Sequence, residues 1–365
     1  MSINSLAGRG LAARSFNFGP FGSFQTRRPK MVLDLHPPHL LFLGDIKNPL
    51  DAKTAMGVLE WRPEHCIGQF RLPGCEIDLG LPDLSPAEAF EAGAKSLLIG
   101  VAPLGGEIAP EWMESIRLSL ASGLSVVSGL HQKLTAVNGL KSIADAEKVA
   151  LVDVRMPPNV HRIASGKKRT GKRLLTVGTD CCVGKKYTAL AVWKALAKQG
   201  VDVTFRATGQ TGIMISGSGI PVDAVVSDFL PGVCEYLTPN AGENHWDIIE
   251  GQGSLFHPAY AAVTLGLMHG SQPDLMLLCH DPNRTAIDGF ESFPIPAISD
   301  SIRCYEEAAR LTNPVARVAG ISLNTAGINK AQSDRICAEV AESTGLPCFD
   351  PLKNAIDALV LDLIS

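Results

Sequence analysis

One stretch of the sequence, residues 174–188, restricts the fold more than any other. An apolar run, Leu174–Val177, leads into Gly178, five intervening residues and then Gly184-Lys185, after which a helix-forming segment begins. This order predicts a buried strand, a tight loop and a helix. The backbone N–H groups of such a loop point inward, and the helix N-terminus and Lys185 add positive charge. The stretch therefore predicts a phosphate-binding site in a parallel α/β sheet.

This loop differs from the common phosphate loop in two ways. Five residues rather than four separate the glycines, and Lys186 stands where a magnesium-binding Ser or Thr is expected. A second lysine adds charge without a metal, which suits a phosphate group that is bound but not cleaved. The residues predicted to hold the phosphorylated ligand are Gly178, Thr179, Asp180, Cys181, Cys182, Val183, Gly184, Lys185 and Lys186.

The composition is that of a globular chain with room for two domains. Its 365 residues are 45% hydrophobic and 19% charged. A net charge of -4 argues against nucleic-acid binding, which needs clustered excess Lys and Arg. No apolar run approaches the roughly 20 residues of a membrane span, so no membrane partner is expected. The nine cysteines form no CxxC pair, and free thiols fit a reducing cytoplasm.

Residues 1–30 differ from the rest of the chain. They carry five basic residues and no acidic one. Such a segment is typical of an organelle transit peptide, of a disordered basic tail, or of a translation start placed upstream of Met31. The absence of an apolar segment typical of a secretion signal leaves these three interpretations open, and the latter two are favoured.

Residues 31–155 are predicted to form a small Rossmann-like α/β domain. Leu40–Ile46, Lys95–Val101 and Leu124–Ser128 are apolar enough for buried strands, and Pro110–Ser122 has helical spacing. Strands that alternate with helices imply a parallel sheet with right-handed crossovers. Residues 156–173 are rich in proline and then in basic residues, and are predicted to be a solvated linker; an alternative is that the basic run helps to hold a phosphorylated ligand.

Residues 174–365 are predicted to form a P-loop NTPase-like doubly wound domain. The phosphate loop leads into a helix at Tyr187–Gln199, which Gly200 can cap. Further strands are predicted at Val201–Thr208, Trp246–Glu250, Leu275–Cys279 and Val318–Asn324, and further helices at Ser301–Leu311 and Ala331–Thr344. The ligand site of such a domain lies at the carboxyl ends of its strands.

Two Gly-rich segments follow predicted strands of this second domain. Residues 206–212 are predicted to form a polar loop, in which Arg206, Thr208 and Gln210 are candidate substrate-binding residues. Residues 216–219 are predicted to form a flexible extension or a lid. In residues 247–258, Glu250 lies at the carboxyl end of a predicted strand, and His257 lies in the loop that follows. Glu250 and His257 are the candidate general bases, although a loop histidine and a structural carboxylate are the plainer alternatives.

Other polar residues at strand ends are weaker candidates. His280 and Arg284 follow the Leu275–Cys279 strand and are predicted to contact substrate; Arg206 or Arg284 could bind a carboxylate through two hydrogen bonds. Asp223 and Asp228 could orient an amine or a metal, but they are expected to face solvent or cap helices. A thiol of Cys181 or Cys182 could carry an acyl group, but packing is the favoured role for both.

The motifs together resemble a known family. Gly178-Thr179-Asp180, Val183-Gly184-Lys185 and Glu250-Gly251-x-Gly253 are similar to the loops of dethiobiotin synthetase, a ligase that uses ATP and magnesium. The fuller match, through residues 178–185, 207–212 and 250–258 and the α/β domain before them, resembles the D-glutamate N-acetyltransferase family. That resemblance covers most of residues 35–360. It implies acetyl-CoA as donor, D-glutamate as acceptor and N-acetyl-D-glutamate as product.

The residue at position 186 bears on the choice between the two chemistries. A kinase or ligase needs a metal to bridge phosphate oxygens, and the loop hydroxyl that helps is replaced by Lys186. Acetyl transfer needs no magnesium, and CoA carries a diphosphate and a 3′-phosphate. We therefore expect an acetyltransferase without a metal site, in a homo-oligomer, with a magnesium-dependent ligase or kinase as the alternative.

Overall fold

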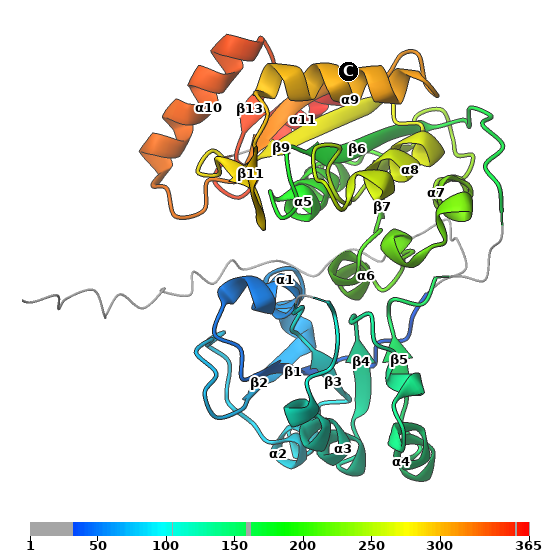
Figure 1. Ribbon diagram of the computed structural model, residues 1–365, viewed down its shortest axis with the longest axis vertical. Helices are drawn as coiled ribbons and strands as arrows, with labels where there is room; N and C mark the ends of the chain where they lie inside the picture. The colour runs from blue at the N-terminus through cyan, green and yellow to red at the C-terminus, as the bar shows by residue number, and fades with distance from the viewer. Residues whose placement is uncertain (1–31, 104, 158–161, 355, 365) are drawn as a thin grey trace, which may run out of the picture.

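Two parallel sheets, each flanked by helices, lie one above the other along the long axis of the molecule (Figure 1). The computed structural model describes residues 32–103, 105–157, 162–354 and 356–364. The prediction made for residues 1–30 lies outside the described residues. The predicted fold class, a smaller Rossmann-like α/β domain followed by a doubly wound P-loop domain, is confirmed.

The first sheet has the strand order β2-β1-β3-β4-β5, with every neighbouring pair parallel. The strands are β1 (His39–Gly44), β2 (Cys66–Arg71), β3 (Ser96–Ile99), β4 (Ser125–Ser128) and β5 (Leu151–Asp153). The helices are α1 (Lys53–Trp61), α2 (Pro86–Glu91), α3 (Met113–Ala121) and α4 (Leu140–Glu147). The central strands are buried along their whole length, as expected for a sheet covered on both faces.

The second sheet has the strand order β13-β12-β9-β6-β8-β7 and is also parallel throughout. Its strands are β6 (Lys172–Gly178), β7 (Val203–Arg206), β8 (Trp246–Ile249), β9 (Leu275–His280), β12 (Arg317–Leu323) and β13 (Cys348–Phe349). The helices are α5 (Lys185–Lys198), α6 (Gln210–Ser216), α7 (Leu230–Leu237), α8 (Ala261–Ser271), α9 (Ile298–Arg310), α10 (Lys330–Thr344) and α11 (Asp357–Ile364). A small antiparallel hairpin, β10 (Ala286–Ile287) and β11 (Phe290–Pro294), follows β9.

Alternate residues of the central strands enter different cores. Leu174 packs with residues of α5, whereas Leu175 and Val177 pack with residues of α7, α8 and α9. Because successive side chains of a strand point to opposite faces, this division shows that helices cover both faces of the sheet. The strands and helices predicted for this domain are confirmed, with ends that differ by up to three residues.

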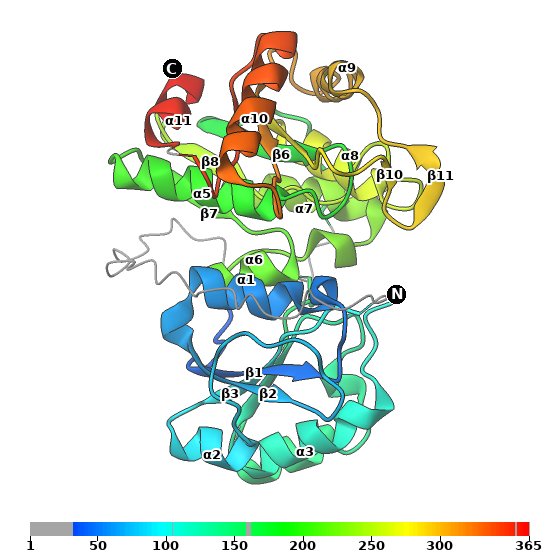
Figure 2. The same ribbon diagram turned by 90° about the vertical axis from the view of Figure 1, so that its left-hand side faces the viewer.

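Helix α1 of the first domain lies against α6 of the second, so that the two helices are stacked between the sheets (Figure 2). The Thr54 and Thr211 hydroxyls are hydrogen-bonded at 3.1 Å, and Arg62 Nε donates to the Ile215 carbonyl at 2.8 Å. One apolar core runs through both domains at this level. The first domain is therefore packed directly onto the edge of the second domain that carries the phosphate loop.

The predictions for two connecting segments have different outcomes. Residues 162–171 form no helix or strand, and Lys167 and Lys168 are exposed, as expected of a solvated linker; Arg173, inside β6, is instead completely buried and donates to the carbonyls of residues 169–171. Residues 210–216 are not loop but helix α6, with Ile213, Met214 and Ile215 in the core. The following Gly217 is held through its carbonyl by the Leu33 amide, so this segment is not a free lid.

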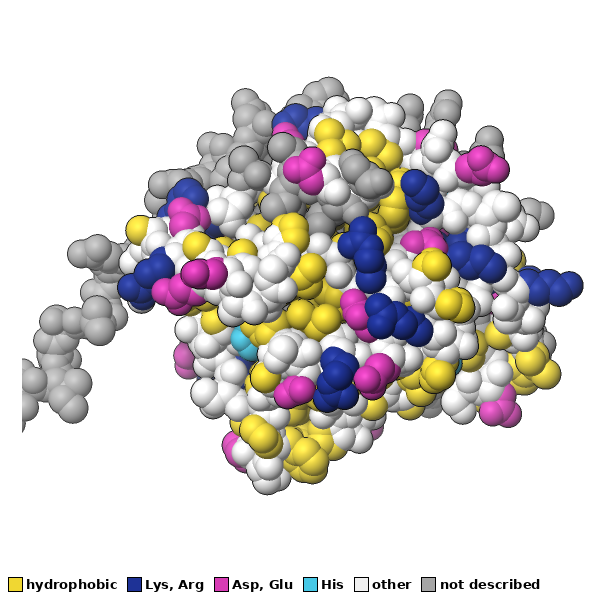
Figure 3. Space-filling view, turned by 90° about the horizontal axis from the view of Figure 1, so that it is seen from above, with side chains coloured by type: hydrophobic (Ala, Val, Ile, Leu, Met, Phe, Trp, Pro, Cys, Tyr) yellow, Lys and Arg dark blue, Asp and Glu magenta, His cyan; other side chains and the backbone are white. Residues whose placement is uncertain are grey.

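The surface shows no large field of one charge on the face of the second domain seen in Figure 3. Lys and Arg side chains there lie interspersed with Asp and Glu. Nucleic-acid-binding faces carry clustered Lys and Arg instead. Within the described residues, no helix has both the length and the apolar character needed to cross a bilayer.

Candidate active site

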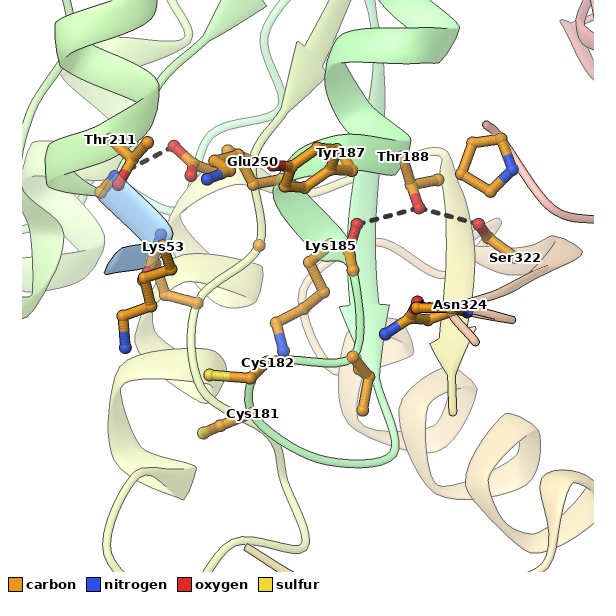
Figure 4. A pocket seen from close by; sticks show the side chains of 18 of the residues that line it. Lys53, Cys181, Cys182, Lys185, Tyr187, Thr188, Thr211, Glu250, Ser322 and Asn324 are labelled. Carbon is orange, nitrogen blue, oxygen red and sulfur yellow. Dashed lines mark hydrogen bonds between the residues drawn. The ribbon is translucent and has the colours of Figure 1, made fainter. Parts of the chain in front are cut away.

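The phosphate loop joins the end of β6 to the start of α5, as the sequence predicts. Cys182 and Gly184 have positive φ angles of 56° and 102°, and these turn the chain sharply before the helix. Within the described residues, the backbone amides of residues 182–187 meet no acceptor. Lys185 Nζ donates to the Asp180 carbonyl at 2.7 Å, so its ammonium stays over the loop (Figure 4). This is a cradle of free donors, suited to an anion.

Asp180 anchors the loop rather than facing a ligand. Its Oδ1 accepts from the Cys181 amide at 2.6 Å, and its Oδ2 accepts from Arg284 Nη1 at 2.7 Å and from the Asp288 amide at 2.9 Å. Arg284 therefore ties the phosphate loop to the segment leading into the β10–β11 hairpin. Burial raises the pKa of the Cys181 thiol to about 11, which agrees with packing rather than nucleophilic chemistry for this cysteine.

A cavity of about 560 Å³ opens between the two domains beside this loop. The first domain contributes α1, the segment before it and Arg155. The second contributes the phosphate loop and first turn of α5, the start of α6, the segment after β8, and the segments that follow β12 and β13. Of the predicted ligand-binding and catalytic residues, Cys181 to Lys186, Gln210 and Glu250 line this cavity.

Glu250 is the buried carboxylate of the cavity. It lies at the carboxyl end of β8 and is 3% exposed. Its Oε2 accepts from the amides of Thr208 and Gly209 at 2.9 and 3.1 Å, while Oε1 has no hydrogen bond to a described residue. Burial raises the pKa of Glu250 from 4.5 to about 7, against the opposing effect of the two amides. One oxygen is thus fixed, and the other is available to a proton near neutral pH.

Glycine at position 212 makes this arrangement possible. A Cβ atom added to Gly212 would lie 2.2 Å from Glu250 Oε2, closer than any side chain can approach. The helix α6 can therefore pack against the carboxylate only with glycine there. The sequence analysis was right to single out the Gly-rich residues 206–212. Gly212, however, allows close packing against Glu250 and does not serve loop flexibility.

Lys186 points away from the phosphate loop and toward the first domain. A Cβ atom added to Gly57 of α1 would lie 2.7 Å from Lys186 Nζ, so the ammonium rests directly on this helix. Its Nζ also lies 4.8 Å from the centre of the Tyr187 ring. Burial lowers the pKa of Lys186 to about 8, while Glu250 and Glu60 oppose that shift. Lys185 and Lys186, adjacent in sequence, therefore serve different parts of the cavity.

Several predicted site residues are not brought to the cavity wall. Arg206 is buried and paired with Asp247 on the neighbouring strand, with Nε and Oδ1 2.6 Å apart. Thr208 is buried and donates its hydroxyl to the Glu250 carbonyl at 2.6 Å. His280 is hydrogen-bonded to the Thr179 hydroxyl at 3.0 Å. These three residues and Arg284 support the loops around the site.

His257 lies behind the phosphate loop. Its Nδ1 accepts from the Ala259 amide at 3.1 Å, and its ring packs against Tyr260 and Phe290. With Asp180 and Cys181 it forms a group whose potential metal-ligand atoms lie within 4.8 Å of one another. Because both oxygens of Asp180 already accept from Arg284 or from amides, this group has little capacity left for a cation.

The hydroxyl of Thr188 does not replace the missing Ser or Thr of the loop. Its Oγ1 donates to the Gly184 carbonyl at 3.1 Å and lies 2.8 Å from the Ser322 hydroxyl (Figure 4). The sequence analysis missed the residues that α1 contributes to the cavity, chiefly Lys53 and Glu60. No motif marks them, because their role depends on how the two domains pack.

The fold and the cavity define a two-domain protein in which a Rossmann-like domain covers the phosphate loop of a P-loop domain. The chain belongs to the DUF1611 family: residues 70–157 match its Rossmann-like domain and residues 162–360 match its P-loop domain, both described as domains of unknown function.

Two named proteins and one solved structure are similar to this chain along most of its length. A protein of Pseudoalteromonas sp. named D-glutamate N-acetyltransferase is 46% identical over 331 residues, which is 91% of this chain and 100% of that protein. A protein of Tritonibacter scottomollicae with the same name is 46% identical over 326 residues, 89% of this chain and 98% of that one. The crystal structure of a DUF1611 family protein from Anabaena variabilis is 31% identical, covers 90% of this chain and 99% of its own, and superposes with a TM-score of 0.81.

Proposed function

We propose that this protein is a D-glutamate N-acetyltransferase, which moves the acetyl group of acetyl-CoA to the amine of D-glutamate and gives N-acetyl-D-glutamate and CoA. Two relatives with this name match along almost their entire length. The observation in the site that carries the proposal is Glu250, a buried carboxylate with a pKa near neutrality, in the same cavity as the phosphate loop. That pairing supplies a base beside an anchor for a phosphorylated donor.

The donor is held by its phosphates at the loop. The amides of residues 182–187 and the ammonium of Lys185 provide the donors. Exposed apolar side chains lie at the cavity on both sides, with Leu50 and Met56 from the first domain and Leu352 from the second. A molecule such as CoA, which joins phosphates to a long arm with methyl and methylene groups, matches this combination of surfaces.

Glu250 acts as the general base. Its free oxygen, Oε1, takes a proton from the ammonium of the amino acid, while Oε2 stays fixed by two amides. The free amine then attacks the thioester carbonyl, the new C–N bond forms, and the C–S bond breaks. The thiolate of CoA leaves with the second proton of the nitrogen. Backbone N–H groups of the Gly-rich segments around the cavity stabilise the oxyanion. No step requires a metal ion.

The test follows release of CoA. The purified protein is incubated with acetyl-CoA and one amino acid in each reaction: D-glutamate, L-glutamate or D-glutamine. A thiol reagent then reports free CoA. We expect fastest release with D-glutamate and an N-acetylated product by mass spectrometry. Magnesium-dependent consumption of ATP without CoA release would contradict the proposal and favour a ligase. Cytoplasmic location and a homo-oligomeric state stay predictions from the sequence.

A further inference from the structure

The cationic side chains at the cavity fall into two groups. Three of them are already engaged: Lys185 donates to the Asp180 carbonyl, Arg155 is paired with Asp223, and Lys353 donates to the carbonyls of residues 325 and 328. The other two, Lys53 and Lys186, have Nζ atoms that donate no hydrogen bond to a described residue. The cavity therefore keeps two cations for a ligand.

These two lysines come from different domains and face the same part of the cavity. Lys53 is the first residue of α1, and its exposed side chain reaches the cavity wall (Figure 4). Lys186 is the second residue of α5, and its ammonium rests on Gly57 of helix α1. Their charges act on each other, because Lys53 contributes to the lowered pKa of Lys186. Two ammonium groups that repel each other favour an anion between them.

An amine-binding end lies next to this pair. The Oε1 of Glu250 is open to the cavity, and Gln210, which is 7% exposed, has a buried Oε1 that accepts no hydrogen bond from a described residue. Gln210 is joined to the first domain by the approach of its Nε2 to the Thr54 hydroxyl at 3.5 Å. Acceptors at one end and two cations beside them match an amino acid that carries two carboxylates.

We propose that Lys186 of α5 binds the α-carboxylate of the acceptor, beside its amine, and that Lys53 of α1 binds the side-chain carboxylate, so that the first domain sets the preference for a dicarboxylic amino acid. This inference rests on the proposed function. It assigns Lys186 to the acceptor rather than to the phosphates of the donor. It also gives the first domain a direct role in recognition, through one lysine that reaches into the site of the other domain.

The decisive variant is Lys53→Met, which removes the charge from an exposed side chain and keeps most of its length. Loss of a charge-assisted hydrogen bond corresponds to a change of about 10- to 100-fold in binding. We expect the KM and the calorimetric Kd for D-glutamate to rise by that factor, with the KM for acetyl-CoA unchanged. Lys53→Arg should restore much of the binding. Lys95→Met, at the start of the β3 region, removes the same charge away from the cavity and should behave as wild type.

Discrimination between acceptors separates this inference from the proposed function. In wild type, D-glutamate should bind more tightly than D-glutamine, which lacks the second carboxylate; in Lys53→Met this ratio should approach one. An unchanged ratio, or a rise confined to the KM for acetyl-CoA, would overturn the role of Lys53. Absence of acetyl transfer in wild type would overturn the proposed function instead, and the binding ratio would still decide the role of Lys53.

Discussion

Replacement of Glu250 by glutamine tests the central group of the site, because it should change activity and stability in opposite directions. Glutamine has the same shape, and its side-chain oxygen can accept from the amides of Thr208 and Gly209 as Oε2 does. It cannot take a proton from the acceptor ammonium. Loss of a general base lowers turnover by about 10²- to 10⁴-fold.

The stability effect follows from the direction of the pKa shift. Burial raises the pKa of Glu250 from 4.5 to about 7, so the folded chain binds this proton more tightly than the unfolded chain does. Below pH 4.5, Glu250 is protonated in both the folded and the unfolded chain, and burying it does not lower the free energy of unfolding. As the pH rises from 4.5 to about 7, the free energy of unfolding decreases, because the unfolded chain releases this proton first. The difference corresponds to about 3 kcal/mol above pH 7, and the opposing effect of the Lys186 ammonium is already included in this shift. Glu250→Gln removes the destabilisation that the buried carboxylate causes above pH 7.

The assay compares denaturant midpoints of wild type and Glu250→Gln at pH 5 and pH 8, together with the pH profile of kcat/KM. We expect the variant to be more stable at pH 8, with a smaller gain at pH 5. In wild type, kcat/KM should decrease as the pH is lowered below about 7. In the variant, this acidic decrease should be absent. Glu91→Gln, on the exposed end of α2, is the matched control. A variant that is less stable at pH 8, or that turns over at the wild-type rate, would refute the reasoning.

Three further predictions concern the loop, the packing around Glu250 and metals. Lys185→Ala should raise the KM for acetyl-CoA about 10-fold or more, measured by CoA release, with little effect on the Kd for D-glutamate; an unchanged KM would remove the loop from the donor site. Gly212→Ala should lower kcat strongly, because the new Cβ would meet Glu250 Oε2 at 2.2 Å; normal kcat in a folded variant would contradict this packing argument. Dialysis against EDTA should leave acetyl transfer unchanged, whereas activity restored only by magnesium would favour ligase chemistry.

Much of the fold could be predicted because its signals are local. The central strands of both sheets and the Gly-bounded loop before α5 depend on residues close together in sequence, and the structure confirms them; the short or edge strands β2, β5 and β13 were not predicted. Helix α6 was missed because its glycines and hydroxyl residues indicate a loop by intrinsic preference. Burial of Ile213, Met214 and Ile215 in the interdomain core overrides that preference.

The sequence by itself determined the P-loop architecture, the phosphate cradle and the position of Glu250 at the end of a strand. Only the tertiary structure decided what surrounds them. It buried Arg206 against Asp247, turned Lys186 onto Gly57, and brought Lys53 of another domain to the cavity. Residue 53 lies far from the loop in the chain, and no local pattern specifies which helix of one domain packs on the other. The loop can therefore be recognised from the sequence, while the set of side chains that faces it depends on how the two domains pack.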